Sequence, residues 1–268
     1  MAIKYTISTN KGGEGKSTSV TNIASEIAKQ GYKTAIIGMD AQGNESLSFG
    51  YRPDDFKDTI YDVLMGEAKA EDVIYKVSDV TDNLYILPAN DDMDYFTMDI
   101  LQEHGTGEEI LHVLKNRLKS IEDQFDYIFV DAPPSMEVVQ INILNYIDRI
   151  IVPYHPSVYS MRSIQRFINR VEKIQNTSNL GLNIEGILVT LYRENTNLHK
   201  INLLDLYKFA QQRKIDVFEE KIPHTIKVGE APLMYRQPAV LVDEYKHLDA
   251  VKNYKEIAKK IIEIDHKQ

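Results

Sequence analysis

The sequence contains no cysteine, and this absence excludes any site that needs thiolate ligands, such as an iron–sulfur cluster. A chain without cysteine is also typical of a cytoplasmic protein. Long apolar runs are missing as well. No stretch of about 18 apolar residues occurs, so no membrane-spanning helix is predicted. The opening residues MAIKYTIS already have the pattern of a strand, and we therefore expect no signal peptide.

The remaining composition fits one folded α/β domain over residues 1–268. Of these residues 43% are hydrophobic, and folds of this length commonly bury a sizeable core in a single domain. Strands are expected at 3–8, 34–38, 84–88, 126–130, 149–153, 184–190 and 217–222. Helices are expected at 17–30, 59–65, 106–122, 136–145, 160–175, 200–213 and 247–264. This alternation predicts a mostly parallel, twisted sheet with helices on both faces.

A glycine-rich loop lies between the first strand and the first helix. Residues 10–18 read NKGGEGKST. Glycines let backbone N–H groups wrap a phosphate, a lysine such as Lys16 reaches the β- and γ-phosphates, and a hydroxyl such as Ser17 reaches Mg²⁺. The helix N-terminus adds a partial positive charge. The loop predicts a nucleotide phosphate site, and a bare glycine-rich turn is the alternative.

Lys11 is a second lysine in this loop, directly before Gly12, and an ordinary P-loop does not require it. The run KGGEGKS resembles the deviant Walker A motif of the ParA/MinD family of ATPases. Residues 36–44 (IIGMDAQGN) and 127–135 (YIFVDAPPS) resemble the family's second motif and its Walker B strand. Three further segments match the partition ATPases in order and spacing: 59–66, 84–90 and 222–232. The resemblance covers nearly the whole chain and implies a P-loop NTPase fold.

The resemblance implies ATP or ADP as the ligand and Mg²⁺ as the cofactor. The nucleotide would be held by Lys11, Gly12, Gly13, Glu14, Gly15, Lys16, Ser17 and Thr18. The metal would be held by Ser17 and, through water, by Asp131. The catalytic residues would be Lys11, Lys16 and Asp40. In the family, the lysine that matches Lys11 reaches the nucleotide of a second subunit in a homodimer, so hydrolysis would depend on dimerisation, as with an arginine finger supplied in trans.

Two aspartates follow predicted strands. Asp131 ends the apolar run 127–130, where a carboxylate beside a P-loop is well placed for Mg²⁺; a solvated strand-end aspartate is the alternative. Asp40 follows the apolar run 35–37. By the resemblance Asp40 orients the attacking water, and the alternative is a turn aspartate before Gly43.

By the same resemblance, the segment 222–232 closes over the base as a loop, and Pro223, His224 and Thr225 contact adenine. His224 stands where the family often has arginine. A loop histidine is more often a surface residue than a ligand, and we assign it no catalytic role. Glu14 departs from the family too, since a small or apolar residue is usual there. Its charge would be unfavourable beside phosphates unless it points outward.

Charge is divided unevenly along the chain. Residues 1–148 hold 12 Lys and Arg against 26 Asp and Glu, a net charge of −14, whereas residues 149–268 hold 19 against 14, a net charge of +5. An acidic protein can still bind DNA through a local basic face. In the short partition ATPases such a face binds non-specific double-stranded DNA. The matching candidates here are Arg193, Lys200, Lys208, Arg213, Lys214 and Lys227. A solvated, charge-balanced surface is the alternative, because acidic residues are interspersed.

The helix expected at 160–175 is a further candidate contact surface. Met161, Arg162 and Arg166 stand where many relatives are acidic or apolar. A patch facing a partner or DNA would account for this difference.

The resemblance favours a ParA-type ATPase of plasmid or chromosome partitioning. Its ATP-bound homodimer would bind non-specific DNA, and a centromere-binding partner of the ParB type would stimulate hydrolysis and release. Such a protein would lie in the cytoplasm, on the nucleoid of a bacterium. The P-loop begins at residue 10, so we expect no N-terminal helix-turn-helix domain.

Two other functions compete with this one. A MinD-like ATPase that cycles on membranes would need an amphipathic C-terminal anchor. Residues 255–264 show an apolar stripe without Phe or Trp, which favours a helix packed on the domain, so no stable membrane association is expected. A bacterial tyrosine kinase would carry a C-terminal tyrosine cluster, and no tyrosine follows Tyr254.

Overall fold

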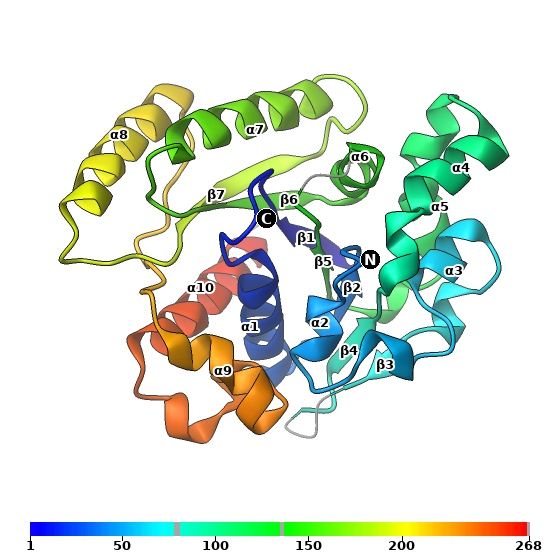
Figure 1. Ribbon diagram of the computed structural model, residues 1–268, viewed down its shortest axis with the longest axis horizontal. Coiled ribbons are helices and arrows are strands. Elements are labelled where there is room, and N and C mark those ends of the chain that lie inside the picture. The colour runs from blue at the N-terminus through cyan, green and yellow to red at the C-terminus, as the bar shows by residue number, and fades with distance from the viewer. Residues whose placement is uncertain (78–80, 135–136, 267–268) are drawn as a thin grey trace.

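The computed structural model describes residues 1–77, 81–134 and 137–266, and it shows strands alternating with helices around one sheet (Figure 1). Seven strands form the sheet in the order β3-β4-β2-β5-β1-β6-β7. Their bounds are β1 Ile3–Ile7, β2 Thr34–Gly38, β3 Tyr75–Lys76, β4 Leu84–Leu87, β5 Tyr127–Asp131, β6 Arg149–Tyr154 and β7 Asn183–Val189. Every pairing is parallel except that of β3 with β4. The predicted α/β class with a mostly parallel sheet is therefore confirmed.

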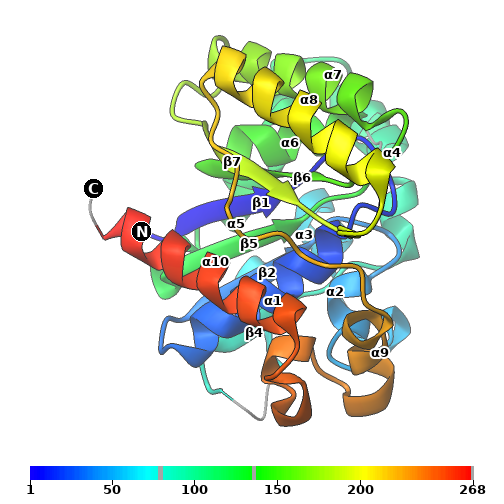
Figure 2. The ribbon, with the colours of Figure 1, turned by 90° about the vertical axis from the view of Figure 1, so that its left-hand side faces the viewer.

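Helices cover both faces of this sheet. Their bounds are α1 Lys16–Lys29, α2 Asn44–Leu47, α3 Ile60–Met65, α4 Phe96–His104, α5 Val113–Leu118, α6 Glu137–Tyr146, α7 Ser160–Gln175, α8 Asn197–Arg213, α9 Ile226–Tyr235 and α10 Asp249–Asp265. Helices α3 to α8 pack in one apolar cluster, and α1, α9 and α10 pack in a second. Figure 2 shows α7 and α8 on one side of the strands and α1, α9 and α10 on the other.

The strand sequences explain this two-sided packing. In β2 all five residues are buried. Ala35 and Ile37 join the cluster under α3 to α8, whereas Ile36 between them joins the cluster under α1 and α10. Because both faces of the strand are covered, Ala35, Ile36 and Ile37 form an apolar run instead of alternating with polar residues.

Three neighbouring strands bring their carboxyl ends to one edge of the sheet. β5 pairs with β1 on one side and with β2 on the other. β1 leads into the glycine-rich loop, β2 leads to Asp40, and β5 ends at Asp131. This edge is where open α/β sheets bind ligands, and it positions the candidate site.

The predicted strand at 217–222 is not a strand. Phe218 N–H donates to Ile187 O and Ile222 N–H donates to Val189 O, but the residues between them leave the register of β7. The predicted helix 106–122 is present only in part: α5 forms within it, a 3₁₀ turn, Glu108–Leu111, precedes α5, and a second 3₁₀ turn, Glu122–Gln124, begins at its end. Gly107, extended at φ −68° and ψ 162°, precedes the first of these turns, and glycine is a poor helix former. Helices α2 and α4 and the edge strand β3 were not predicted.

The segment 222–232, expected to be a loop, becomes helical at Ile226. The Thr225 hydroxyl accepts a hydrogen bond from Lys227 N–H and caps the start of α9, as threonine commonly does. Gly229 and Pro232 lie inside this helix, although the resemblance implied a loop there. Ser135, the last residue of the predicted 127–135 motif, and residue 136, the predicted start of a helix, lie outside the described residues.

The C-terminal helix packs on the domain. The apolar stripe of α10 is buried in the same cluster as α1: Ile257, Ala258, Ile261 and Ile262. Within the described ranges, no helix is long and apolar enough to cross a membrane.

Candidate functional site

The glycine-rich loop wraps tightly between β1 and α1. Gly13 and Gly15 have φ values of 73° and 74°, in the left-handed region that side chains with a Cβ rarely adopt. Lys16 follows directly as the first residue of α1. The loop backbone therefore depends on glycine at both positions, as phosphate binding by backbone N–H groups requires.

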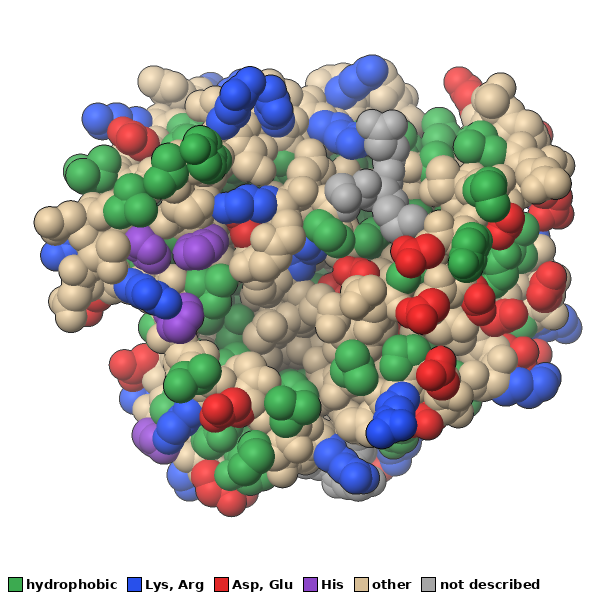
Figure 3. Space-filling view, viewed as in Figure 1, with side chains coloured by type: hydrophobic (Ala, Val, Ile, Leu, Met, Phe, Trp, Pro, Cys, Tyr) green, Lys and Arg blue, Asp and Glu red, His purple; other side chains and the backbone are tan. Residues whose placement is uncertain are grey.

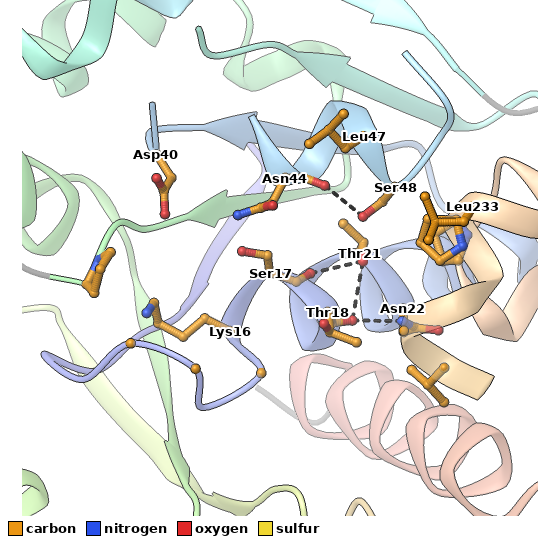
Figure 4. Close-up of a pocket in the computed structure, with 18 residues that line it drawn as sticks. Lys16, Ser17, Thr18, Thr21, Asn22, Asp40, Asn44, Leu47, Ser48 and Leu233 are labelled. Carbon is orange, nitrogen blue, oxygen red and sulfur yellow. Dashed lines mark hydrogen bonds between the residues drawn. The ribbon is translucent and has the colours of Figure 1, made fainter. Parts of the chain in front are cut away.

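The loop forms one wall of a cavity of about 540 Å³ (Figure 4). Its lining comprises Gly12, Gly13, Gly15, Lys16, Ser17, Thr18, Thr21, Asn22, Asp40, Asn44, Leu47, Ser48, Pro134, Val228, Gly229, Pro232, Leu233 and Pro238. Figure 4 shows the Lys16 ammonium and the Asp40 carboxylate pointing toward the same open space. One end of the cavity is thus polar and the end formed by α9 is apolar, which suits a phosphate chain joined to a flat base.

Asp131 lies fully buried at the end of β5. Among the described residues, neither carboxylate oxygen has a hydrogen-bond partner of acceptable geometry. Burial raises the pKa of Asp131 to about 8; the charge of Glu45 adds to this rise, and the Ser17 hydroxyl and Lys16 oppose it. A buried carboxylate without partners is costly unless a cation or proton compensates it. Asp131 and Ser17 therefore fit a divalent cation.

Such a cation would need ligands from outside the protein. No group of three or more His, Cys, Asp or Glu residues in the described part of the chain could hold a metal by itself. Mg²⁺ commonly takes one or two protein groups, with phosphate oxygens and water as the remaining ligands. The composition of the site agrees with a metal that arrives with a nucleotide.

Glu45 is a buried carboxylate that the sequence analysis did not single out. It is fully buried, and its Oε1 accepts hydrogen bonds from Ala89 N–H at 2.9 Å and Ser46 Oγ at 3.1 Å. Burial raises the pKa of Glu45 to about 7, and nearby Asp40 adds to the rise. The one sequence feature that could have pointed to Glu45 is its position directly after the 36–44 motif. Glu45 is thus a third carboxylate, close to Asp131 and Asp40.

Asp40 is 9% exposed and lines the cavity. Its Oδ1 accepts a hydrogen bond from Gln42 N–H at 3.1 Å, which is the turn geometry of the alternative interpretation. The two roles are compatible, since the turn holds the carboxylate at the cavity wall.

Lys11 and Glu14 form an ion pair within the loop instead of lining the cavity. Lys11 Nζ lies 3.1 Å from Glu14 Oε1 and donates to Ser157 Oγ at 2.8 Å. Glu14 is 3% exposed, so its side chain does not point outward to solvent. Burial raises the pKa of Glu14, and Lys11 opposes the rise. Lys16 Nζ donates to Lys11 O at 3.2 Å.

The structure does not bring the three expected adenine contacts to the cavity. Arg193 and His224 are hydrogen-bonded to each other at 3.2 Å, Thr225 caps α9, and Pro223 pairs with Tyr192. None of the three lines the cavity, whose apolar wall comes from α9.

The six basic candidates for DNA contact do not form one patch. Arg213 is ion-paired with Glu172 of α7 at 2.7 Å, and Lys227 lies over the Tyr245 ring at 5.8 Å. Lys200 and Lys208 are exposed on α8, and Lys214 follows its end. Helices α8 and α9 pack on opposite faces of the sheet, so Lys227 is on a different face from the candidates of α8. Arg193 is hydrogen-bonded to His224, which precedes α9.

A family model described as an AAA domain matches residues 3–184, and a chromosome-partitioning ATPase Soj and chromosome partitioning proteins ParA match most of the chain. The chain belongs to this AAA-domain family, in the ParA/MinD group of P-loop ATPases. The resemblance drawn from the two-lysine loop is thereby confirmed.

Three relatives of this ParA/MinD chain illustrate the match. The sporulation initiation inhibitor protein Soj of Bacillus subtilis is 28% identical over 243 residues, 88% of this chain and 90% of Soj. Cobyrinic acid a,c-diamide synthase of Mycobacterium smegmatis, solved with ADP and magnesium, has a TM-score of 0.81 at 25% identity, over 98% of this chain and 94% of that one. MinD of Pyrococcus horikoshii, solved with Mg-ADP, has a TM-score of 0.75 at 24% identity, over 97% and 96%, and shows the shared P-loop fold.

Proposed function

We propose that this protein is a ParA-type ATPase that hydrolyses ATP to ADP and phosphate with Mg²⁺ and acts in plasmid or chromosome partitioning. The observation that carries the proposal is the glycine-rich loop, which lines a cavity of about 540 Å³ with Lys16 and Ser17. Next to Ser17 lies the buried Asp131, whose carboxylate oxygens have no hydrogen-bond partner of acceptable geometry among the described residues. Similarity to Soj and ParA over most of the chain supports the same conclusion.

The proposal assigns roles to the loop, to the two aspartates beside it and to the apolar wall of the cavity. The backbone N–H groups of 12–18 and the Lys16 ammonium bind the phosphates, since phosphoryl transfer asks mainly for positioning and charge neutralisation. Ser17 and Asp131 hold Mg²⁺, which neutralises phosphate charge when bound. Asp40 orients the attacking water. The apolar residues of α9 pack on the base, and contacts from Pro223, His224 and Thr225 require their segment to approach it.

The proposal includes an ATP-bound homodimer in which Lys11 reaches the nucleotide of the second subunit. For this, Lys11 must leave Glu14 and the serines that hold it here. The dimer binds non-specific double-stranded DNA, and a ParB-type partner stimulates hydrolysis. The protein would then act in the cytoplasm, on the bacterial nucleoid.

The packing of α10 favours this proposal over a MinD-like membrane cycle. Ile257 and Ile261 are fully buried in the cluster that contains α1. An anchor made from this stripe would have to leave the core, which costs about 1.5–3 kcal/mol for each large side chain exposed. We therefore propose no stable membrane association.

One set of measurements tests the proposal. Purified protein is assayed for Mg²⁺-dependent ATP hydrolysis, for ATP-dependent dimerisation by light scattering, and for binding to a random-sequence duplex with ATP, ADP or no nucleotide. We expect dimers and DNA binding with ATP alone, and slow hydrolysis. A chain that hydrolyses ATP but stays monomeric and binds no duplex would overturn the partition function, and one that hydrolyses no ATP would overturn the ATPase. Lys16→Ala is the matched negative control.

A further inference from the structure

Four basic side chains follow one another along the outer face of α7. They are Arg162, Arg166, Arg170 and Lys173, which we call the α7 stripe. Their spacing of four, four and three residues keeps them within about 80° of one another around the helix axis. The opposite face of α7 is buried in the core through Ile164, Phe167, Ile168, Val171 and Ile174. The stripe therefore points away from the domain over a length of about 16 Å.

The charges of the α7 stripe are uncompensated. Within the described ranges no ion pair involves any of its four residues. Glu172 is the one acidic residue in the sequence of α7, and Arg213 of α8 binds both of its oxygens, at 2.8 and 2.7 Å. Figure 3 shows Lys and Arg side chains along the upper rim over α7, whereas Asp and Glu side chains gather toward α3 to α5.

We propose that the α7 stripe binds the sugar–phosphate backbone of duplex DNA. The inference rests on the proposed function, and it names a DNA surface that the six earlier candidates do not include. Arginine forms forked hydrogen bonds with phosphate oxygens, and successive positive charges along one line suit a row of phosphates. Contacts to phosphates carry no sequence information, so this surface binds DNA of any sequence.

The chemistry of the outer face favours DNA over an acidic protein. Protein interfaces are anchored by buried aromatic or apolar side chains. Within α7 the exposed neighbours of the stripe, Gln165 and Asn169, are polar. The exposed apolar side chains Val158 and Tyr159 lie before the helix, at one end of the stripe. Since the whole chain has a net charge of −9, attraction to DNA must be local, and added salt will weaken it steeply.

The start of α7 is joined to the nucleotide loop. Ser160 is the first residue of α7, and Lys11 Nζ donates to its Oγ at 3.4 Å and to Ser157 Oγ at 2.8 Å. When Lys11 turns to a second subunit, the segment before α7 loses these hydrogen bonds. The nucleotide state therefore acts directly on the end of the helix that carries the stripe.

The test uses the full chain and a fluorescein-labelled 40-base-pair random-sequence duplex, with anisotropy measured with ATP and Mg²⁺ across salt concentrations. The variant R162Q/R166Q/R170Q removes three charges of the stripe. The matched control K69Q/K115Q/K119Q removes three exposed charges from the acidic half of the chain. Affinity falls as salt rises, and each phosphate contact contributes about 0.9 to the steepness of log affinity against log salt. We therefore expect the stripe variant, which loses three contacts, to be less steep than the wild type by about 2.7. The control variant should keep the wild-type slope.

The outcomes separate this proposal from the proposed function. If the wild type binds DNA with ATP and the stripe variant binds with the same slope and affinity, the α7 proposal is overturned and the partition function stands. If the stripe variant loses binding to poly-L-glutamate but not to DNA, the surface belongs to an acidic protein. If the wild type binds no duplex in any state, both proposals fail. An unchanged thermal midpoint of the stripe variant shows that lost binding is not lost folding, because exposed substitutions usually shift stability by less than about 0.5 kcal/mol.

Discussion

Lys11 Nζ lies 3.1 Å from Glu14 Oε1, so the second lysine of the loop is ion-paired inside its own subunit. Glu14 is buried, and its charge raises the pKa of Lys16 against the lowering caused by burial. The negative charge of Glu14 therefore acts on both lysines that the proposed mechanism uses. It also stands close to where the phosphates of ATP would lie.

Replacing Glu14 with Gln should tighten ATP binding. The change removes a negative charge near the phosphates and keeps the size of the side chain, so we expect a gain of about 1 kcal/mol, or about fivefold in affinity. Titration with a fluorescent ATP analogue in Mg²⁺ buffer measures this. Glu26→Gln, which also neutralises a buried carboxylate of α1, is the matched control and should bind as the wild type does. Unchanged or weaker binding by Glu14→Gln would contradict the electrostatic argument.

The sequence predicted the centre of the fold well because its signals there are local. β1, β2 and β5 are short runs rich in β-branched and aromatic residues, and the loop glycines are contiguous with Lys16 and Ser17. The helix α9 was missed because the segment 222–232 was assigned as a loop from the family resemblance. Its local signals conflict, since Thr225 is a good helix cap whereas Gly229 and Pro232 are poor helix formers.

Contacts between distant residues could not be predicted from the sequence. No periodic pattern around Glu45 predicts that its side chain is buried. The carboxylate accepts a hydrogen bond from Ala89 N–H, 44 residues further along the chain. The pairing of Lys11 with Ser157 spans 146 residues. The charge of the α7 stripe stays uncompensated because Arg213 of another helix binds Glu172, a contact that no local pattern reveals.

Glu45 should make the stability of the nucleotide-free protein fall as pH rises. Its pKa is raised from 4.5 to about 7 in the folded state, so the folded protein holds a proton that the unfolded chain has released. This contribution is fully present below pH 4.5 and is lost as pH rises through 7, by at most roughly 3 kcal/mol. Glu45→Gln does not titrate, so its unfolding free energy should fall less between pH 5 and pH 8. Urea unfolding at both pH values measures the difference, and parallel curves for the two proteins would refute it.

Gly38→Ala should destabilise the protein by about 1–3 kcal/mol. A Cβ at this position would overlap the Glu45 carboxylate and lie 2.9 Å from Ala89 N, where the backbone cannot move freely. Gly107→Ala is the control, because it has φ −68° and no atom within 4 Å of the added Cβ. The midpoint of urea unfolding should drop for the first variant alone. Equal midpoints would show that the Glu45 side chain yields to the methyl group.

Asp40→Ala should trap the ATP-bound dimer. If Asp40 orients the attacking water, its loss should slow hydrolysis by about a hundredfold or more and leave phosphate binding by Lys16 intact. Light scattering with ATP and Mg²⁺ should then show a persistent dimer where the wild type returns to monomer. Asp94→Ala, at an exposed position far along the chain, should behave as the wild type. A variant that remains monomeric with ATP would count against a purely catalytic role.

Asp131→Asn should remove the response of the protein to Mg²⁺. Both carboxylate oxygens are buried and have no hydrogen-bond partner of acceptable geometry among the described residues, so a cation that binds there with ADP stabilises the folded state by mass action. The thermal midpoint of the wild type with ADP should rise when Mg²⁺ is added, and that of Asp131→Asn should not. Without ligands the variant should be the more stable protein above pH 8, because the wild type must then bury an unpaired charge. If Mg²⁺ raises both midpoints equally, Asp131 is not part of the metal site, and Ser17 with the phosphates would hold the ion without it.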